Sequence, residues 1–204
     1  MRKILNAIIH FLAGDQAAGK SDEKIMDKST VARSDRLSKT RYLTHAAIIA
    51  AAYAALTILL APISFGQQQL RVAEALSILP AFTPAAIPGL FIGCALANTV
   101  SFFGLPDLIF GSLATLISAQ LTYMIARAVK TRGLLLQAVL IPLPAVLINT
   151  VVIGILISVL ADVPFTIAAF GVMAGQALSC YGLGAPLFIM LRGYARRLIA
   201  RQSL

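Results

Sequence analysis

Charged side chains are scarce in this chain of 204 residues. They make up 12 % of the sequence, whereas hydrophobic residues make up 59 % and the mean hydropathy is +0.87. Soluble globular domains have only about 45–50 % apolar residues, so the composition excludes that class. A spanning helix needs about 20 apolar residues, which leaves room for about five to seven spans and none for a separate catalytic domain. We therefore expect an all-α integral membrane protein that forms one compact bundle.

Cysteines are few, and a phosphate-binding loop is absent from the sequence. The two cysteines, Cys94 and Cys180, both lie within apolar runs and form no CxxC pair. A disulfide framework or a zinc site would need more thiols at suitable spacing, so redox and zinc chemistry are not expected, and neither is a cofactor. The pattern GxxxxGK[ST], which cradles the phosphates of ATP, does not occur. The chain cannot itself be an ATP-driven motor.

Acidic residues are fewer than basic ones, 8 against 17, which gives a net charge of +9. Sixteen of the 17 basic residues lie in three segments, namely residues 1–41, residues 127–132 and the sequence after Leu191. Basic residues of membrane proteins collect on the cytoplasmic side. We interpret the positive charge as a topology signal and expect no nucleic-acid partner.

The chain divides into a polar tail at residues 1–41, an apolar region at 42–193 and a basic end at 194–204. We expect a cytoplasmic tail, a transmembrane substrate-binding domain and a second cytoplasmic tail. The first residues have the basic and apolar order of a signal peptide, but Asn6 and His10 interrupt the apolar run. A short amphipathic helix on the cytoplasmic leaflet is the favoured interpretation. Residues 22–39 are typical of a solvated linker.

Hydropathy divides the apolar region into five stretches, at residues 43–60, 71–103, 108–128, 134–160 and 165–191. The second stretch contains Pro80, Pro84 and Pro88, so it is either one kinked span or two short helices joined near Thr83. If all three basic segments are cytoplasmic, the chain must cross twice here. We expect six helices with both termini in the cytoplasm, the short second helix being covered by its neighbours.

On that topology, three connections face outward and form one surface, at residues 61–70, 104–107 and 161–164. Arg71 and Glu74 are costly within a membrane. They could pair with each other three residues apart, or line a pocket for a polar solute. Asp107 could simply cap the next helix. The gathering of several polar residues favours the pocket; these residues are Gln69, Arg71, Glu74, Asn98, Asp107, Asn149 and Gln176.

Three blocks of this region resemble a known family. They are Ala61-Pro-Ile-Ser-Phe-Gly66 leading into Gln69-Leu-Arg71-Val-Ala-Glu74-Ala-Leu76 and Leu79-Pro80, then Pro88-Gly-Leu-Phe-Ile-Gly-Cys94 with Asn98, then Asp107-Leu-Ile-Phe-Gly-Ser-Leu-Ala-Thr115. The blocks resemble the QueT family of queuosine-precursor transporters, which are substrate-binding S components of energy-coupling factor (ECF) transporters. The resemblance covers about residues 44–191, and the Gln69/Arg71/Glu74 block is its most specific part.

The resemblance implies a six-helix bundle of the S-component type in the cell membrane, with an outward-opening pocket roofed by the outer loops. It implies binding without catalysis, and a partnership with a transmembrane coupling subunit and two ATPase subunits. The implied substrate is a 7-deazaguanine such as preQ1, preQ0 or queuine.

The first span carries two overlapping rows of alanine at four-residue spacing. Small residues allow another helix to approach closely, which suits packing within the bundle as well as docking of a partner. The resemblance favours docking, because relatives contact the coupling subunit through such a face. Gly89 and Gly93 repeat the spacing in the third helix, and we interpret them as internal packing. The predicted docking residues are Ala46, Ala47, Ala50, Ala51, Ala54 and Ala55.

The chemistry of the implied substrate suggests roles for the polar residues. A 7-deazaguanine presents its N1–H and its exocyclic amine as adjacent donors, and a carboxylate, for which Glu74 is the candidate, can accept from both. Asn98, Asn149 and Gln176 can serve the remaining polar groups of the base. Asp107 could face a cationic aminomethyl group, and Arg71 would orient Glu74. Aromatic side chains could stack on the base, although such residues are more often core or interfacial; the candidates are Phe65, Phe102, Phe103 and Tyr181.

Three alternatives remain. An intramembrane enzyme would need a base or a metal-holding cluster, but His10 and His45 lie far along the sequence from Glu74 and Asp107. A solitary secondary transporter or channel is favoured by internal inverted repeats, and the sequence shows none by eye. An S component for a different vitamin is the third alternative.

Overall fold

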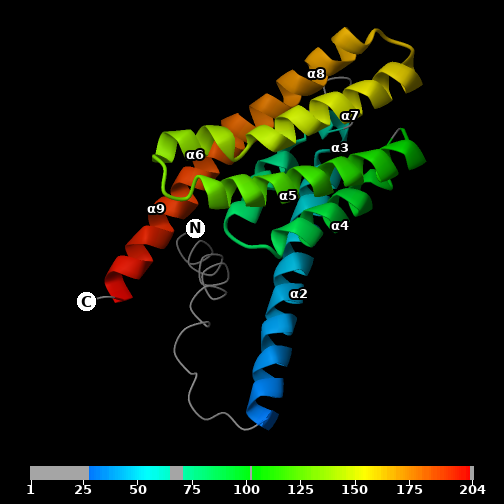
Figure 1. Cartoon of the computed structure of the whole chain (residues 1–204). Coiled ribbons are helices and arrows are strands. Elements are labelled where there is room, and N and C mark those ends of the chain that lie inside the picture. Colours follow the sequence, from blue (N-terminus) through cyan, green and yellow to red (C-terminus); the bar gives the residue numbers. More distant parts are fainter. Residues whose placement is uncertain (1–27, 65–70, 102, 203–204) are drawn as a thin grey trace.

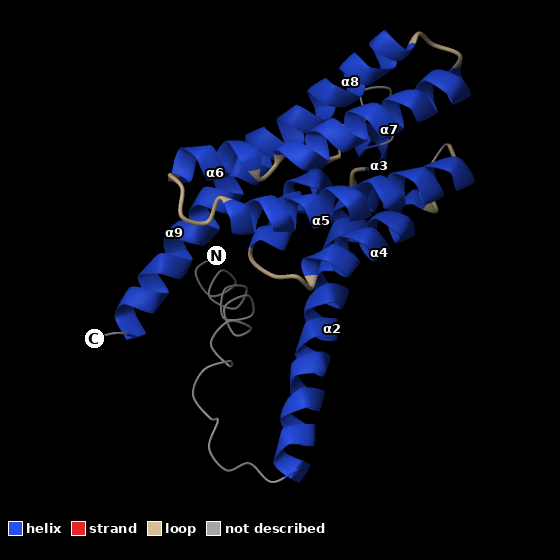
Figure 2. Cartoon of the chain, viewed as in Figure 1, coloured by secondary structure: helices blue, strands red, loops and turns tan. Residues whose placement is uncertain are grey.

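The structure is a computed structural model that describes residues 28–64, 71–101 and 103–202. In these ranges every regular element is a helix (Figures 1 and 2). The predictions for residues 1–27 lie outside the described part. In chain order the elements are α2 (Lys28–Leu59), α3 (Ala61–Ser64), η1 (Val72–Ala81), α4 (Ala86–Asn98), η2 (Asp107–Gly111), α5 (Ser112–Ala128), α6 (Leu134–Leu140), α7 (Leu143–Ala161), α8 (Phe165–Ala177), η3 (Leu178–Gly184) and α9 (Ala185–Gln202).

Four of the described helical runs are long and apolar enough to cross a membrane, at Ser38–Leu59, Asp107–Ala128, Leu134–Ala161 and Phe165–Tyr194. Two shorter apolar helices, η1 and α4, complete the bundle. The prediction of an all-α membrane protein is therefore confirmed. Residues 28–39, interpreted from the sequence as linker, instead belong to α2, because no proline or glycine interrupts this helix before its end at Leu59.

The proline-containing stretch forms two short helices, as one of the two sequence interpretations predicted. η1 ends at Ala81 and α4 begins at Ala86. Between them the Thr83 N–H donates to the Leu79 carbonyl, and the Thr83 hydroxyl accepts from the Ala85 N–H. η1 is a tight 3-10 helix and most of its residues are buried. Its neighbours in the bundle therefore cover its backbone polar groups, which a membrane-embedded segment requires.

Helices α2 and α4 pack at very short range. A Cβ atom built on Gly89 would lie 2.8 Å from the Ala46 carbonyl oxygen, and one built on Gly93 would lie 2.8 Å from the Ala50 carbonyl oxygen. Only glycine permits this approach of one helix to the backbone of another. The prediction that Gly89 and Gly93 serve internal packing is confirmed.

This contact separates the two alanine rows of α2. Ala46, Ala50 and Ala54 are buried within the chain, whereas the second row remains exposed. The buried row faces α4 and cannot also offer an open surface. The predicted docking face is thereby reduced to one row, which consists of Ala47, Ala51 and Ala55.

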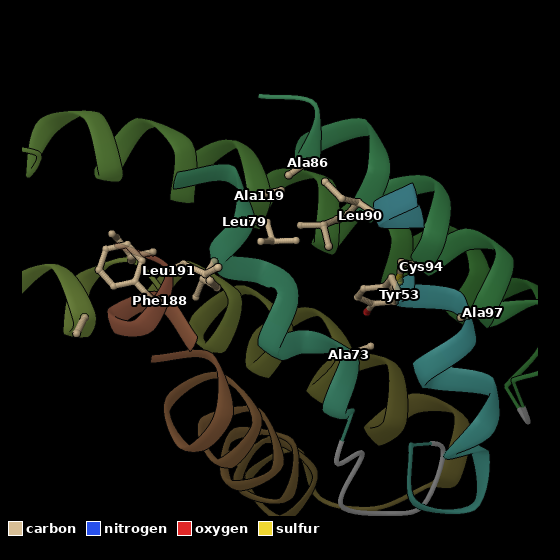
Figure 3. Close-up of a cluster of buried hydrophobic side chains, with 14 residues drawn as sticks. Tyr53, Ala73, Leu79, Ala86, Leu90, Cys94, Ala97, Ala119, Phe188 and Leu191 are labelled. Carbon is tan, nitrogen blue, oxygen red and sulfur yellow. The ribbon is translucent and has the colours of Figure 1, made fainter. Parts of the chain in front are cut away.

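The main core lies where α2, η1, α4, α5 and the start of α9 meet (Figure 3). Tyr53, Ile78 and Leu90 are almost fully buried there, and the rings of Phe82 and Phe188 lie 5.4 Å apart. A second apolar cluster joins α7 to α8, the pair that runs side by side in Figure 1. Because Ala73, Ile78 and Leu79 belong to the main core, η1 lies in the interior of the bundle.

Candidate functional site

A set of polar side chains is buried within this apolar bundle. Such groups are costly to bury and require partners. Each is at most 4 % exposed, and together they come from η1 or the residue before it, α4, η2, α5, α7, α8 and η3; they are Arg71, Glu74, Ser77, Asn98, Asp107, Ser112, Thr115, Asn149, Gln176 and Ser179.

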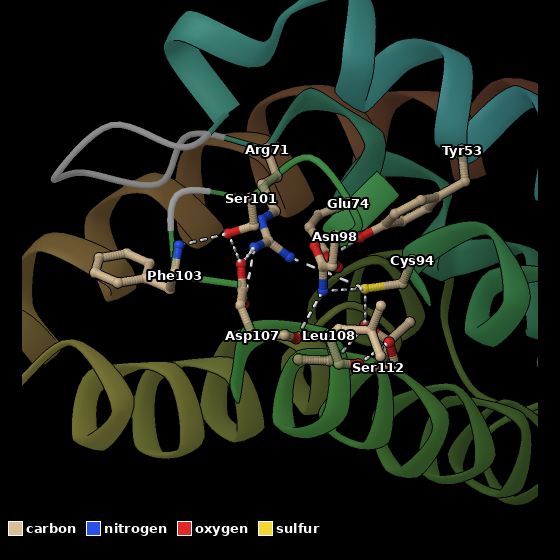
Figure 4. A network of polar contacts seen from close by, with 12 residues as sticks. Tyr53, Arg71, Glu74, Cys94, Asn98, Ser101, Phe103, Asp107, Leu108 and Ser112 are labelled. Carbon is tan, nitrogen blue, oxygen red and sulfur yellow. Dashed lines mark hydrogen bonds and ion pairs between the residues drawn. The ribbon is translucent and has the colours of Figure 1, made fainter. Parts of the chain in front are cut away.

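Arg71 and Asp107 form a buried ion pair (Figure 4). The Arg71 Nη2 atom lies 2.9 Å from Asp107 Oδ2 and 3.2 Å from Oδ1, and the Ser101 hydroxyl also donates to Oδ2. Arg71 precedes η1, and Asp107 begins η2. Two alternatives that the sequence left open are therefore not realised: Arg71 pairs with Asp107 and not with Glu74, and the Asp107 carboxylate accepts from side chains of other segments and does not cap the helix that follows.

Glu74 lies on η1 and is 1 % exposed. Its Oε1 atom accepts a hydrogen bond of 2.6 Å from the Tyr53 hydroxyl, which comes from α2 (Figure 4). Its Oε2 atom has no hydrogen-bond partner among the residues that the structure describes. Sequence reasoning missed Tyr53, although a tyrosine hydroxyl in the middle of an apolar span needs a partner and could have drawn attention to it.

Asn98 and Cys94 connect α4 to this group. The Asn98 side-chain amide donates to the Asp107 carbonyl oxygen at 2.9 Å and lies 3.4 Å from Cys94 Sγ. The Asn98 Oδ1 atom lacks a hydrogen-bond partner within the described ranges. The Cys94 thiol also accepts a hydrogen bond of 3.2 Å from the Thr115 hydroxyl. Cys94 was predicted only as part of an apolar run, and its role in this network is a finding of the structure.

Gly111 makes the approach of Asn98 and Asp107 possible. A Cβ atom at this position would lie 2.7 Å from Asn98 Nδ2 and 2.9 Å from Asp107 Oδ1. Gly111 ends η2, a π-helical segment at the start of the second long helical run, Asp107–Ala128, and such segments are frequent at functional sites. A second π-helical segment, η3, packs against η1 from another side.

Gln176 and Asn149 lie on α8 and α7, and each is 2 % exposed. Gln176 Oε1 lies 3.8 Å from Cys180 Sγ, and that thiol donates to the Glu74 carbonyl oxygen at 3.7 Å. Asn149 precedes Ile153 by one helical turn, and Ile153 Cδ1 lies 3.7 Å from the Cβ position of Gly111. Asn149 therefore shares the face of α7 that packs on η2.

Several predicted site residues are placed elsewhere. Tyr181, predicted to stack on the base, packs with Ala145 and Val146, and its hydroxyl donates to the Val139 carbonyl oxygen at 2.9 Å. Phe103 packs against the cluster between α7 and α8. The predictions for Phe65, Gln69 and Phe102 lie outside the described residues.

Several buried polar atoms near η1 lack hydrogen bonds to the residues that the structure describes. Within the described part of the chain, buried atoms without partners include two acceptors, Glu74 Oε2 and Asn98 Oδ1, and two groups that can donate, Asn149 Nδ2 and Ser179 Oγ. An unsatisfied buried group costs about 1–3 kcal/mol. A ligand with donors for the carboxylate and an acceptor for the amide would satisfy them. No group of three or more His, Cys, Asp or Glu side chains suited to a metal ion occurs in the described ranges.

Comparisons with known proteins relate this helical bundle to a family of transporters. The "Queuosine precursor transporter QueT" of Lactococcus lactis subsp. cremoris (strain MG1363) is 40 % identical over 86 residues, which are 41 % of this chain and 50 % of that relative. The match thus spans half the length of the curated relative. No solved structure matches. The model of the family described as QueT transporter matches residues 43–193, which are most of the chain and include the whole site. This protein therefore belongs to the QueT transporter family.

Proposed function

We propose that the protein is the membrane-embedded substrate-binding subunit, or S component, of an ATP-driven ECF importer. It captures a queuosine precursor, a 7-deazaguanine such as preQ1, preQ0 or queuine, from outside the cell. Family membership and the name of the Lactococcus relative support the substrate class. The observation that carries the proposal is the buried Glu74 carboxylate, whose Oε2 atom has no partner among the described residues.

The free polar atoms fit the functional groups of a 7-deazaguanine. The N1–H and the exocyclic amine donate to Glu74, because a carboxylate has about four lone-pair sites and Tyr53 uses one of them. Asn149 Nδ2 donates to the base carbonyl, and Asn98 Oδ1 accepts from the pyrrole N–H. Asp107 holds Arg71 in place, because its carboxylate already accepts from Arg71 and Ser101. Gln176 supports the far side of η1 through Cys180.

Titration of the purified chain with a panel of bases tests this function. Isothermal calorimetry in detergent is expected to show binding of 7-deazaguanines and none of 7-deazaadenine, whose corresponding ring edge has an acceptor in place of the N1–H donor. A folded chain that binds none of the 7-deazaguanines would overturn the substrate. Uptake into proteoliposomes that needs no ATP and no ATPase subunits would instead indicate a solitary secondary transporter.

Coupling to an ATP motor requires a docking surface. The exposed row of α2, formed by Ala47, Ala51 and Ala55, lies on a helix whose opposite face contacts α4 and Glu74. Small side chains there allow close approach of a partner helix. We assign this row to contact with the transmembrane coupling subunit.

Substitution of the exposed row should separate transport from binding. We expect Ala51→Leu with Ala55→Leu to abolish ATP-dependent uptake while leaving calorimetric ligand binding intact, because the added side chains extend away from the bundle. The matched variant Ala50→Leu should instead lower the melting temperature, since Ala50 lies in the close contact with Gly93. Unchanged uptake in the exposed double variant would show that the row is not the docking face.

The topology proposal places both termini and the 129–133 loop in the cytoplasm, following the distribution of basic residues. In a chain whose Cys94 and Cys180 have been replaced, a cysteine at Ser64 should react with an impermeant thiol reagent in intact cells. A cysteine at Thr131, which is exposed in its loop, should react only after the membrane is permeabilised. Labelling of position 131 in intact cells would refute the six-helix topology.

A further inference from the structure

Tyr53 contacts Glu74 directly but has no role in the function proposed above. Its side chain is fully buried (0 % exposed), and its hydroxyl donates to Glu74 Oε1 at 2.6 Å. Tyr53 Cβ lies 2.9 Å from the Cβ position of Gly93, so α4 holds the tyrosine closely from one side. Figure 3 shows Tyr53 beside Cys94 of α4, and Figure 4 shows its hydroxyl directed at the Glu74 carboxylate. Tyr53 therefore has little freedom to move away from Glu74.

We infer that Tyr53 is a positioning residue, which fixes the Glu74 carboxylate in the orientation that presents Oε2 to the ligand. This inference rests on the proposed function, because it assigns Tyr53 a part in ligand recognition. The terminal torsion of a glutamate is broad and sets no orientation by itself. A short hydrogen bond from a buried hydroxyl to a carboxylate is charge-assisted and supplies that orientation.

The choice of acceptor supports a role in recognition. A tyrosine that served packing alone could donate to a helix carbonyl, as Tyr181 does to Val139. Tyr53 instead engages one oxygen of a carboxylate whose second oxygen is without a partner within the described ranges. The unpartnered Asn98 Oδ1 belongs to the same polar network (Figure 4). Fixing Glu74 thus pre-organises acceptors before the ligand arrives, which favours ligands with several donors.

The inference predicts the behaviour of Tyr53→Phe. This change removes only the hydroxyl and should raise the calorimetric Kd for a 7-deazaguanine by roughly tenfold, about the effect of one net hydrogen bond. Tyr123→Phe is the matched control, because Tyr123 lies on α5 with Arg127 over its ring and has no contact with Glu74. It should leave the Kd unchanged.

A double-variant cycle separates positioning from a purely structural role. If Tyr53 acts through Glu74, then Tyr53→Phe should cost almost nothing further in the Glu74→Gln background. Losses that add in the double variant would overturn the inference, as would an unchanged Kd for Tyr53→Phe alone. Melting temperatures are recorded for each variant. If Tyr53→Phe does not fold, 4-aminophenylalanine at position 53 replaces it, because this residue keeps a donor at the same place. The 4-aminophenylalanine variant should retain most of the affinity. Loss of binding by a folded 4-aminophenylalanine variant would also count against the inference.

The wild-type titration distinguishes this inference from the proposed function. If the folded wild type binds no 7-deazaguanine, both fail. If it binds and Tyr53→Phe binds equally well, the substrate stands and only the role of Tyr53 is lost.

Discussion

Replacing Glu74 with glutamine is expected to weaken binding of a 7-deazaguanine by about ten- to hundredfold or more, from the loss of about 1–3 kcal/mol for one buried unsatisfied group. The change keeps the side-chain volume but places an amide N–H where a carboxylate oxygen accepted. That N–H would face the donors of the base. The Tyr53 hydroxyl can still donate to the remaining oxygen, so the fold should be much less affected.

Calorimetric titration of wild type and Glu74→Gln in detergent, with melting temperatures measured alongside, tests this expectation. Asp162→Asn is a matched control, because Asp162 is an exposed carboxylate in the connection between α7 and α8, and asparagine tolerates its left-handed backbone at φ 51°. Near-wild-type affinity combined with a lower melting temperature would give Glu74 a structural role. It would also remove the main chemical support for a guanine-like ligand.

Removal of Asp107 should have the largest effect on stability. Asp107→Leu leaves the Arg71 guanidinium, which is 3 % exposed, without its carboxylate partner. Breaking a buried ion pair by removing one member costs about 3–5 kcal/mol, because the remaining buried charge loses the attraction of its carboxylate partner in a medium of low dielectric constant. We expect a large fall in the melting temperature and loss of folded protein at physiological temperature.

A compensating variant distinguishes lost charge pairing from lost packing. Arg71→Met combined with Asp107→Leu buries neither charge of this pair, so it should recover much of the stability that Asp107→Leu loses. The melting temperatures of the two single variants, the double variant and wild type form the cycle. A double variant no more stable than Asp107→Leu would show that the pair contributes through geometry and not through charge compensation.

The helices could be predicted from the sequence, but the ion pair could not. Long apolar runs and the three prolines determine where helices begin and end, so the break near Thr83 was foreseeable. Pairing of Arg71 with Glu74 was the local expectation at a spacing of three. Arg71 instead precedes η1 with an extended backbone at φ −86° and ψ 97°, outside the helical geometry that the expectation assumed. Its partner is 36 residues away, and only the packing of α4 and α5 around η1 brings it near.

The buried polar residues around Glu74 show the same limit, namely that contacts between distant segments cannot be predicted from local sequence. Glu74, Asn98 and Asn149 were predicted as site residues because polar groups in an apolar region are conspicuous, and the structure buries all three. Tyr53 and Cys94 were missed because each is compatible with an apolar span when read singly. The two alanine rows of α2 are equivalent by spacing, and only the position of α4 shows which row is covered.

Under the proposed function, the burial of these polar residues has a kinetic consequence for capture of the ligand. Arg71, Glu74, Asn98, Asp107 and Asn149 are each at most 3 % exposed, so a solute reaches them only while the protein is open. Under that function, the rate of association at high external concentration is set by how often the protein opens, so the observed rate levels off as the concentration rises. Escape of a bound molecule must wait for the same opening. Slow opening therefore gives a long residence time, during which the proposed importer can receive the energy that drives import.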